Sequence, residues 1–164
     1  MAEIFLKERS LTQEELKFLR ELSRQKIRFL IVGLGAAALQ GVNVATQDVD
    51  LWFKKLSDPR IAATIRKLGG AYIEPRPEFM NPPRFVGPAF RNLDIVTSLS
   101  GISSFDREYQ KAVTIEIEGV RLKVLPLEDV IKSKEGAGRP KDKAVMPVLK
   151  DALATIRQSE KKRR

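Results

Sequence analysis

The sequence contains no cysteine and no histidine among its 164 residues. Disulfide bonds and thiolate metal sites are therefore excluded. The imidazole group, the commonest zinc ligand and the usual general base near neutral pH, is missing as well. Any catalysis by this chain has to use carboxylates, lysines, hydroxyls or a hard metal ion.

Long apolar segments are also missing from the sequence. No run is long enough to span a bilayer, and the opening segment MAEIFLKERS lacks the apolar stretch and cleavage site of a secretory signal. A cytoplasmic location without membrane contact is expected. The length suits one hydrophobic core, so residues 1–158 are predicted to form a single domain. Residues 159–164, which end in four cations, are predicted to be a basic disordered tail.

Positive charge is in excess over the whole chain. Thirty Lys and Arg residues stand against 21 Asp and Glu, which gives a formal net charge of +9. A field of this sign concentrates phosphates near the surface and favours a nucleotide or nucleic acid as partner. The hydrophobic share of 43% and the charged share of 31% are typical of a globular protein.

The hydrophobic pattern predicts alternating helices and strands. Helices are expected at about 12–25, 36–41, 59–68, 127–137 and 141–158, and strands at 27–32, 48–53, 93–96, 112–118 and 120–125. Residues 74–88 carry five prolines and are interpreted mainly as an irregular loop across one edge of the sheet. This order predicts an α+β domain, an α/β two-layer arrangement with helices packed on one face of a mixed β-sheet.

Asp48 and Asp50 form the first candidate site. Their spacing on a strand puts both side chains on the same face, where the two like charges repel each other. A shared divalent cation is the usual reason to tolerate that arrangement, although a pair of this kind on an edge strand can also simply face water. The apolar neighbours from Leu51 to Phe53 indicate a strand inside the sheet and favour the cation site.

Three further segments carry candidate chemistry. The turn of Gly33, Leu34 and Gly35 between a strand and a helix would let backbone N–H groups approach phosphate, or would be a plain tight turn. Asp94 is a lone acid on a predicted strand that would join Asp48 and Asp50 if the two strands are neighbours. The segment from Lys134 to Asp142 is a basic cluster between two helices, suited to phosphate or to solvent.

Together these segments resemble the nucleotidyltransferase superfamily, which includes DNA polymerase β, poly(A) polymerases and aminoglycoside nucleotidyltransferases. The family pattern is a strand ending in Gly followed by Gly or Ser, a short helix, an Asp–hydrophobic–Asp strand and a later carboxylate. It corresponds here to Val32-Gly33-Leu34, Asp48-Val49-Asp50 and Asp94, with Leu34 in place of the family's second Gly or Ser.

A narrower likeness is to a bacterial and archaeal subgroup related to abortive-infection and type IV toxin nucleotidyltransferases. It is carried by Thr46 ahead of the Asp pair, by Leu125 to Ile131, and by the later Lys134 and Arg139-Pro140-Lys141-Asp142. The resemblance spans about residues 28–150.

The resemblance implies a metal-dependent enzyme that transfers a nucleoside monophosphate from an NTP, ATP among them, to a hydroxyl of an RNA or tRNA, a protein or a small molecule. Two Mg²⁺ ions would be held by Asp48, Asp50 and Asp94, and Asp94 would help to deprotonate the attacking hydroxyl. The nucleotide-binding residues implied are Gly33, Leu34, Gly35, Thr46, Lys134 and Lys141.

Two other readings stay open. Leu34 in the phosphate turn favours a catalytically weak or silent binding module of the same fold, for example one component of a toxin–antitoxin pair. A nucleic-acid-binding protein without chemistry would explain the charge of +9 but not the carboxylates. The acceptor site is hypothesised to take residues from a second copy, in a homodimer, or from a partner subunit.

Overall fold

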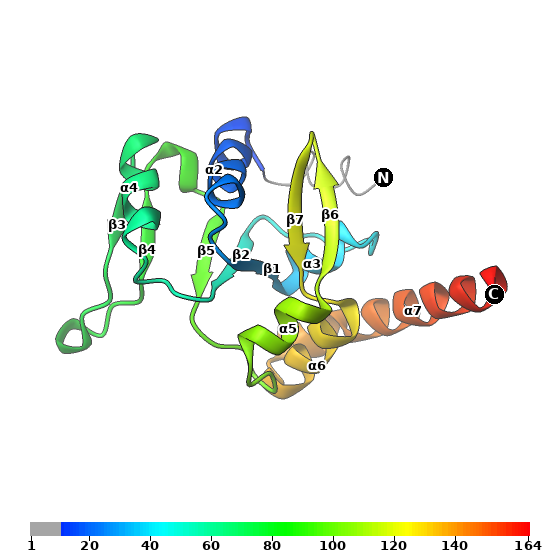
Figure 1. The fold of residues 1–164 in the computed structure, drawn as a ribbon. Helices are drawn as coiled ribbons and strands as arrows, with labels where there is room; N and C mark the ends of the chain where they lie inside the picture. Colours follow the sequence, from blue (N-terminus) through cyan, green and yellow to red (C-terminus); the bar gives the residue numbers. More distant parts are fainter. Residues whose placement is uncertain (1–10) are drawn as a thin grey trace.

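The computed structural model describes residues 11–164 (Figure 1). Residues 1–10, which the sequence analysis placed in the single domain and searched for a signal, lie outside the described part. The helices are α2 (Gln13–Arg24), α3 (Gly33–Leu39), α4 (Pro59–Lys67), α5 (Phe105–Lys111), α6 (Leu127–Ala137) and α7 (Pro140–Arg163), with short 3-10 helices η1 (Pro77–Phe79) and η2 (Pro88–Phe90). The strands are β1 (Phe29–Val32), β2 (Val49–Phe53), β3 (Ala71–Ile73), β4 (Arg84–Val86), β5 (Leu93–Val96), β6 (Val113–Ile117) and β7 (Val120–Val124).

Five of the strands form one mixed sheet in the order β5-β2-β1-β7-β6. β2 lies antiparallel to β1 and parallel to β5, while β7 lies parallel to β1 and antiparallel to β6. β3 and β4 pair separately as a two-stranded antiparallel sheet. The predicted α+β class with a mixed sheet is therefore confirmed, and β2 lies inside the sheet as its apolar residues indicated.

One face of the sheet carries an aromatic core. Phe53 of β2 contacts Phe29 of β1 and Phe85 of β4. Phe18 of α2 packs edge-on against Phe85 and Phe90, with ring centroids 5.6 and 5.0 Å apart respectively. These contacts tie the small β3–β4 sheet to the main sheet through α2.

The opposite face of β2 is partly covered by α5, a helix that the sequence analysis did not predict. Trp52 points away from Phe53 because successive strand residues alternate between faces, and its ring meets Phe105 of α5 at 5.1 Å. Helices therefore contact both faces of the sheet, whereas the sequence predicted helices on one face. Asp50 and Trp52 share the α5 face, two residues apart.

Several local signals in the sequence give the elements that they predict. Thr12 caps α2 and exchanges hydrogen bonds with Glu15 in a capping box. The β6–β7 hairpin turns at Glu118 and Gly119, both with positive φ, as a two-residue hairpin requires. Pro59 begins α4 in its first turn.

Two regions differ from the sequence prediction. The proline-rich segment is not only loop, since it contains β4, whose Phe85 is 7% exposed. The local sequence pattern did not predict this strand, because the strand forms through contacts with β3 and with core aromatics that lie elsewhere in the sequence. α7 continues past Gln158 to Arg163, where a disordered tail was expected. Lys and Arg in the last turn of a helix favour its continuation because they complement the negative end of the helix dipole.

Phe18→Ala is expected to lower the free energy of unfolding by about 3–5 kcal/mol, because it removes a fully buried ring from the contacts with Phe85 and Phe90. Phe79→Ala is the matched control, since that ring is 70% exposed, and it should change stability by no more than about 0.5 kcal/mol. Urea unfolding followed by circular dichroism measures both. Equal losses in the two variants would contradict this description of the core.

Candidate functional site

A cleft of about 1040 Å³ opens at the end of β1 and β2. It is lined by residues from separate parts of the chain, including Gly33, Leu34, Thr46, Asp48, Asp50, Arg84, Asp94, Ser98, Ser133, Lys134 and Lys141. All the site residues predicted from the sequence except Gly35 line this cleft. The fold therefore brings these residues together.

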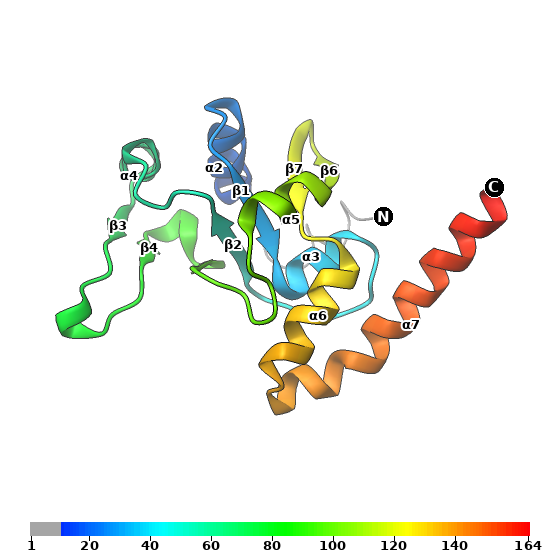
Figure 2. The same ribbon diagram turned by 60° about the horizontal axis from the view of Figure 1, so that its bottom comes forward.

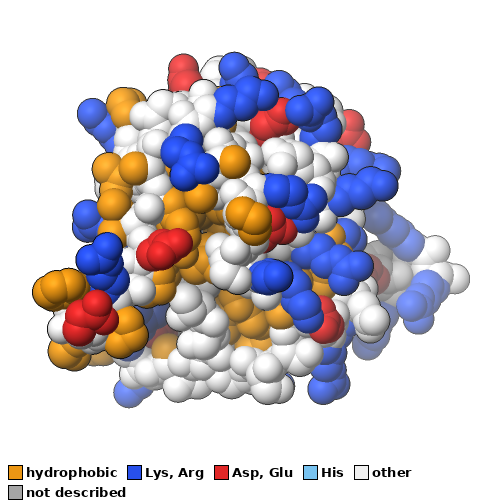
Figure 3. Space-filling model, turned by 60° about the vertical axis from the view of Figure 1, so that its left-hand side comes forward, with side chains coloured by type: hydrophobic (Ala, Val, Ile, Leu, Met, Phe, Trp, Pro, Cys, Tyr) orange, Lys and Arg blue, Asp and Glu red, His pale blue; other side chains and the backbone are white. Residues whose placement is uncertain are grey.

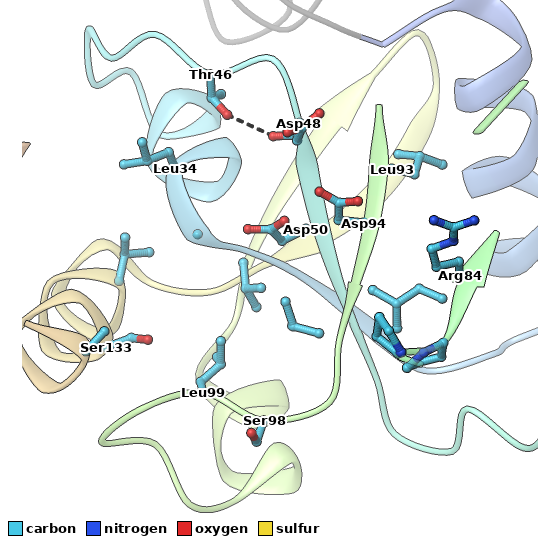
Figure 4. Close-up of a pocket in the computed structure, with 18 of the residues that line it drawn as sticks. Leu34, Thr46, Asp48, Asp50, Arg84, Leu93, Asp94, Ser98, Leu99 and Ser133 are labelled. Atoms are coloured by element: carbon cyan, nitrogen blue, oxygen red, sulfur yellow. Dashed lines mark hydrogen bonds between the residues drawn. The ribbon is translucent and has the colours of Figure 1, made fainter. Parts of the chain in front are cut away.

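The parallel pairing of β2 with β5 brings two of the carboxylates together. In its register Asp50 stands opposite Asp94, and the Val49 N–H donates to the Asn92 carbonyl at 2.7 Å. Asp48 precedes β2 by one residue and lies two residues before Asp50. Figure 4 shows the three aspartates on neighbouring chain segments around one space. The predicted neighbourhood of the two strands is thus correct.

The electrostatics of the site are those of unneutralised like charges. Burial raises the pKa of the Asp50 carboxyl, and the nearby Asp94 and Asp48 raise it further. Burial also raises the pKa of Asp94, with Asp48 adding to the shift. None of the three aspartates forms an ion pair with another residue of the 11–164 segment. The carboxylates are therefore left to a ligand or to protons.

These aspartates offer the donor chemistry of a divalent cation site. Clustered carboxylate oxygens are the ligands that Mg²⁺ takes. Burial and, after it, mutual repulsion raise the pKa values of Asp50 and Asp94, and a cation would relieve the repulsion. As they stand, however, no three acidic side chains within residues 11–164 are close enough together to form a ready metal site. The donors fit the metal, and their side chains would have to converge on it.

The turn after β1 lies against Asp50. Gly33 has φ +66°, and a Cβ built on it would stand 2.6 Å from Asp50 Oδ2. Glycine is therefore required at this position for two reasons: the backbone is left-handed, and the Asp50 carboxylate lies too close for a side chain. α3 begins at Gly33 itself, so the chain turns within the first residues of the helix, which we call the Gly33 turn, and not in a separate tight turn as predicted.

Leu34 and Gly35 occupy different positions from each other. The Leu34 side chain lines the cleft, whereas Gly35 is buried in α3 against Val49. Gly35 was predicted to contact the nucleotide, but it does not line the cleft. A helical glycine packed on a strand gives the same Gly-x-Gly pattern as a phosphate-binding turn. The sequence pattern alone therefore does not distinguish a packing glycine from a ligand-binding one.

Asp142 organises the basic side of the cleft, although the sequence analysis did not assign it a site role. Its side chain is 1% exposed and accepts hydrogen bonds from Arg139, with Nε at 2.7 Å, while Lys134 Nζ lies 3.3 Å away. These cations lower the pKa of Asp142 to about 2, with the Arg139 hydrogen bond as the largest cause. Lys134 is held at the cleft in this way, and Lys141 beside it is exposed.

A side-chain bridge fixes this basic side relative to the Gly33 turn. Gln40, at the end of α3, donates to the Leu125 carbonyl at 2.8 Å and accepts from the Leu127 N–H at 3.1 Å. α6 therefore starts at a set position beside α3. Lys134, two turns along α6, faces Asp50 closely enough to lower its pKa, as does Lys141.

The far wall of the cleft comes from β4 and η2. It contributes Arg84, Phe85, Phe90 and Arg91, of which the two arginines are exposed. Figure 3 shows Lys and Arg side chains spread over this side of the molecule. The sequence analysis missed this wall because it treated the proline-rich segment mainly as an irregular loop.

Thr46 also lines the cleft and fixes the chain that leads into β2. Its hydroxyl donates to the Asp48 carbonyl at 2.9 Å, the contact drawn as a dashed line in Figure 4. The hydroxyl therefore holds the backbone of the residue that carries the first carboxylate.

Comparison with known proteins finds structural neighbours. No protein-family model and no curated protein sequence matches the chain. The crystal structure of ANT(2'')-Ia in complex with adenylyl-2''-tobramycin is 17% identical and covers 86% of this chain and 89% of its own, with a TM-score of 0.57. The solution structure of the antibiotic-resistance factor ANT(2'')-Ia is 16% identical and covers 92% and 90%, also with a TM-score of 0.57.

These neighbours define the fold of the chain. ANT(2'')-Ia is an aminoglycoside nucleotidyltransferase, and the match extends over most of both chains. The chain therefore has the nucleotidyltransferase fold, as its Gly33, Asp48-Asp50 and Asp94 pattern predicted. No helix within residues 11–164 has the length and apolar character needed to cross a membrane.

Gly33→Ala is expected to destabilise the protein by at least about 1–2 kcal/mol, because the left-handed conformation is strained for alanine and the new Cβ meets Asp50 Oδ2. Gly35→Ala is the matched control. Its Cβ would make only ordinary contacts, at 3.7 Å, and alanine favours a helix over glycine by about 1 kcal/mol. Chemical unfolding of both variants checks this; a stable Gly33→Ala protein would refute the stated role of Gly33.

Asp94→Asn is expected to raise the melting temperature at pH 7 in the presence of EDTA. Because the folded-state pKa of Asp94 is raised, its contribution to stability is complete below the unfolded pKa of about 3.9 and is lost as the pH rises through the folded value. The gain of the variant should therefore vanish below pH 4. Melting curves across pH measure it, beside the exposed Asp151→Asn as control. An equal gain at both pH values would count against the burial and repulsion of the charged carboxylate as the cause.

Proposed function

We propose that this chain is a metal-dependent nucleotidyltransferase that moves a nucleoside monophosphate from an NTP to a hydroxyl of an acceptor. The observation that carries the proposal is the cleft in which Asp50 and Asp94 stand in register, Asp48 lies beside them and the Gly33 turn faces Asp50. The nucleotidyltransferase fold supports it. The cytoplasm, where NTPs are abundant, is the proposed location.

The metal in this proposal is Mg²⁺, two ions as the family resemblance implies. Asp48, Asp50 and Asp94 would hold the ions, which when bound supply positive charge to the triphosphate. Cation binding would also remove the repulsion that, together with the larger effect of burial, raises the pKa values of Asp50 and Asp94. The loss of that repulsion favours loading of the site.

The remaining chemistry falls to the side chains of the cleft. A carboxylate of the triad, Asp94 in our proposal, accepts the proton of the acceptor hydroxyl. The hydroxyl oxygen then bonds to the α-phosphorus while the bond from this phosphorus to the bridging oxygen breaks, and pyrophosphate leaves. Lys134 and Lys141 stabilise the negative charge that develops on the pyrophosphate. Asp142 keeps Lys134 at the cleft.

Gly33, Leu34 and Thr46 complete the proposed nucleotide site. They line the cleft between the carboxylates and α3, so the phosphates would lie between this turn and the lysines. The proposed wider group is that of the abortive-infection and type IV toxin nucleotidyltransferases. The acceptor class proposed from the sequence covers RNA, protein and small molecules; the solved neighbour was captured with adenylylated tobramycin, a small molecule.

A silent binding module of the same fold is the second candidate function, for example as one component of a toxin–antitoxin pair. Two observations favour it: Leu34 occupies the cleft where the family pattern has Gly or Ser, and the acidic side chains are not gathered into a ready metal site within residues 11–164. Such a module would bind nucleotide or partner without transfer.

Incubation with each α-labelled NTP, Mg²⁺ and total cellular RNA or protein tests the proposal. Label should pass to an acceptor with the wild type and fall by at least about a thousandfold with Asp50→Asn, because that change removes a ligand charge at the centre of the triad. Asp151→Asn, an exposed change on α7, should transfer as well as the wild type. Absence of transfer together with absence of Mg²⁺-dependent nucleotide binding by calorimetry would refute the enzyme.

A further inference from the structure

α7 leads from the cleft to a distant part of the surface. Its first turn carries Lys141, which lines the cleft, and its C-terminal half extends away from the sheet (Figure 2). With 24 residues, at about 1.5 Å of rise per residue, the helix reaches roughly 36 Å. An extended ligand that runs along α7 therefore reaches the cleft at the N-terminal end of the helix.

Several cations of α7 lie on one side of the helix, whereas Lys141, Lys162 and Arg163 lie on other sides. Lys143, Lys150, Arg157 and Arg164 recur every seven residues, and Lys161 lies one turn after Arg157, so the five form a stripe along one side of the helix. We call this set the α7 stripe. Successive members of the seven-residue series are about 10 Å apart along the axis.

The neighbouring side of α7 faces the protein. Leu149 is fully buried, and Val145, Ala152 and Ile156 pack against the core. Among the large hydrophobic side chains of the helix only Val148 is strongly exposed, at 43%. A helix that inserts into a membrane interface needs its apolar side free, so an anionic lipid surface is disfavoured as the ligand of the stripe.

The stripe is only weakly neutralised by the protein itself. Lys150 pairs with Glu135 at 2.9 Å and Arg157 with Glu128 at 3.3 Å, and all four side chains are more than half exposed. Exposed pairs of this kind contribute at most about 1 kcal/mol, so a phosphate can compete for either cation. Lys143, Lys161 and Arg164 form no ion pair with any residue from 11 to 164.

We infer that the α7 stripe binds the phosphodiester backbone of a single-stranded nucleic acid. A row of evenly spaced cations matches a repeating polyanion better than it matches a compact ligand, and the net charge of +9 attracts such a chain from a distance. Resting on the proposed function, this strand is also the acceptor: it would leave the stripe at the N-terminal end of α7 and pass round the helix to Lys141 and the carboxylates, because Lys141 lies on the other side of α7 from Lys143. A polycation such as tobramycin, named with the solved neighbour, would be repelled by the same surface.

The test is a binding experiment that needs neither NTP nor Mg²⁺. A stripe variant carries Lys143→Gln, Lys150→Gln, Arg157→Gln, Lys161→Gln and Arg164→Gln. A matched control removes the same number of charges elsewhere through Lys17→Gln, Arg20→Gln, Lys55→Gln, Arg66→Gln and Lys67→Gln, all exposed. Fluorescence anisotropy with a labelled 20-nucleotide single-stranded RNA and, separately, with polyglutamate measures affinity over a salt series.

The stripe variant should bind the RNA at least about tenfold more weakly than the matched control at 0.1 M salt. Its slope of log K against log salt should be shallower by up to about 3.5, because each lost phosphate contact on a single strand removes about 0.7. Equal loss in both variants would mean net charge alone and would overturn the inference. Tighter binding of polyglutamate than of RNA would overturn it in favour of an acidic protein partner.

Failure of this inference and failure of the proposed function give different results. Stripe-dependent RNA binding without nucleotidyl transfer would support the α7 stripe as a nucleic-acid site and refute the proposed enzyme activity. Nucleotidyl transfer to a small molecule, with no stripe-dependent RNA binding, would support the proposed enzyme activity and refute the nucleic-acid acceptor. If both hold, the stripe variant should raise the KM for the RNA acceptor while leaving the KM for NTP unchanged.

Discussion

The parallel pairing of β5 with β2 is the constraint on which the candidate site depends. The bond from the Val49 N–H to the Asn92 carbonyl sets a register in which Asp94 stands opposite Asp50. A slip of one residue would turn Asp94 to the other face of the sheet, toward the aromatic core. Leu93, which is 4% exposed, would then leave that core, so hydrophobic packing on one face holds the carboxylates together on the other.

The cleft keeps its opposite charges on separate elements. The carboxylates lie at the start of β2 and on β5, whereas Lys134 and Lys141 come from α6 and α7. Asp142 is the exception, since its buried carboxylate neutralises charge at the start of α7 and orients two cations. Because Asp50 and Asp94 form no ion pair with any cation among the described residues, the function proposed above assigns their charge to a bound metal ion.

Sequence patterns predicted the elements whose causes are local. The capping box of Thr12 and Glu15, the Gly119 turn and the alternation in β2 each act within a few residues, and each was found. Phe85 and Arg84 could not be placed in this way, because β4 forms only against β3 and Phe18 of α2. The pairing of β2 with β5 is equally non-local, and only the family resemblance predicted that Asp94 would join the site.

Leu34 bears on how tightly the cleft would hold a nucleotide, and not on whether the proposed metal ligands are present. Where relatives have Ser, leucine removes one side-chain donor, and a hydrogen bond to a charged group contributes about 1.5–3 kcal/mol. Where relatives have Gly, it adds a side chain to the cleft wall but leaves the backbone N–H in place. Neither change touches Asp48, Asp50 or Asp94. Under either proposal, Leu34 is expected to weaken the affinity for nucleotide, whereas a silent protein also requires that the three carboxylates, which are all present, do not converge on a metal ion.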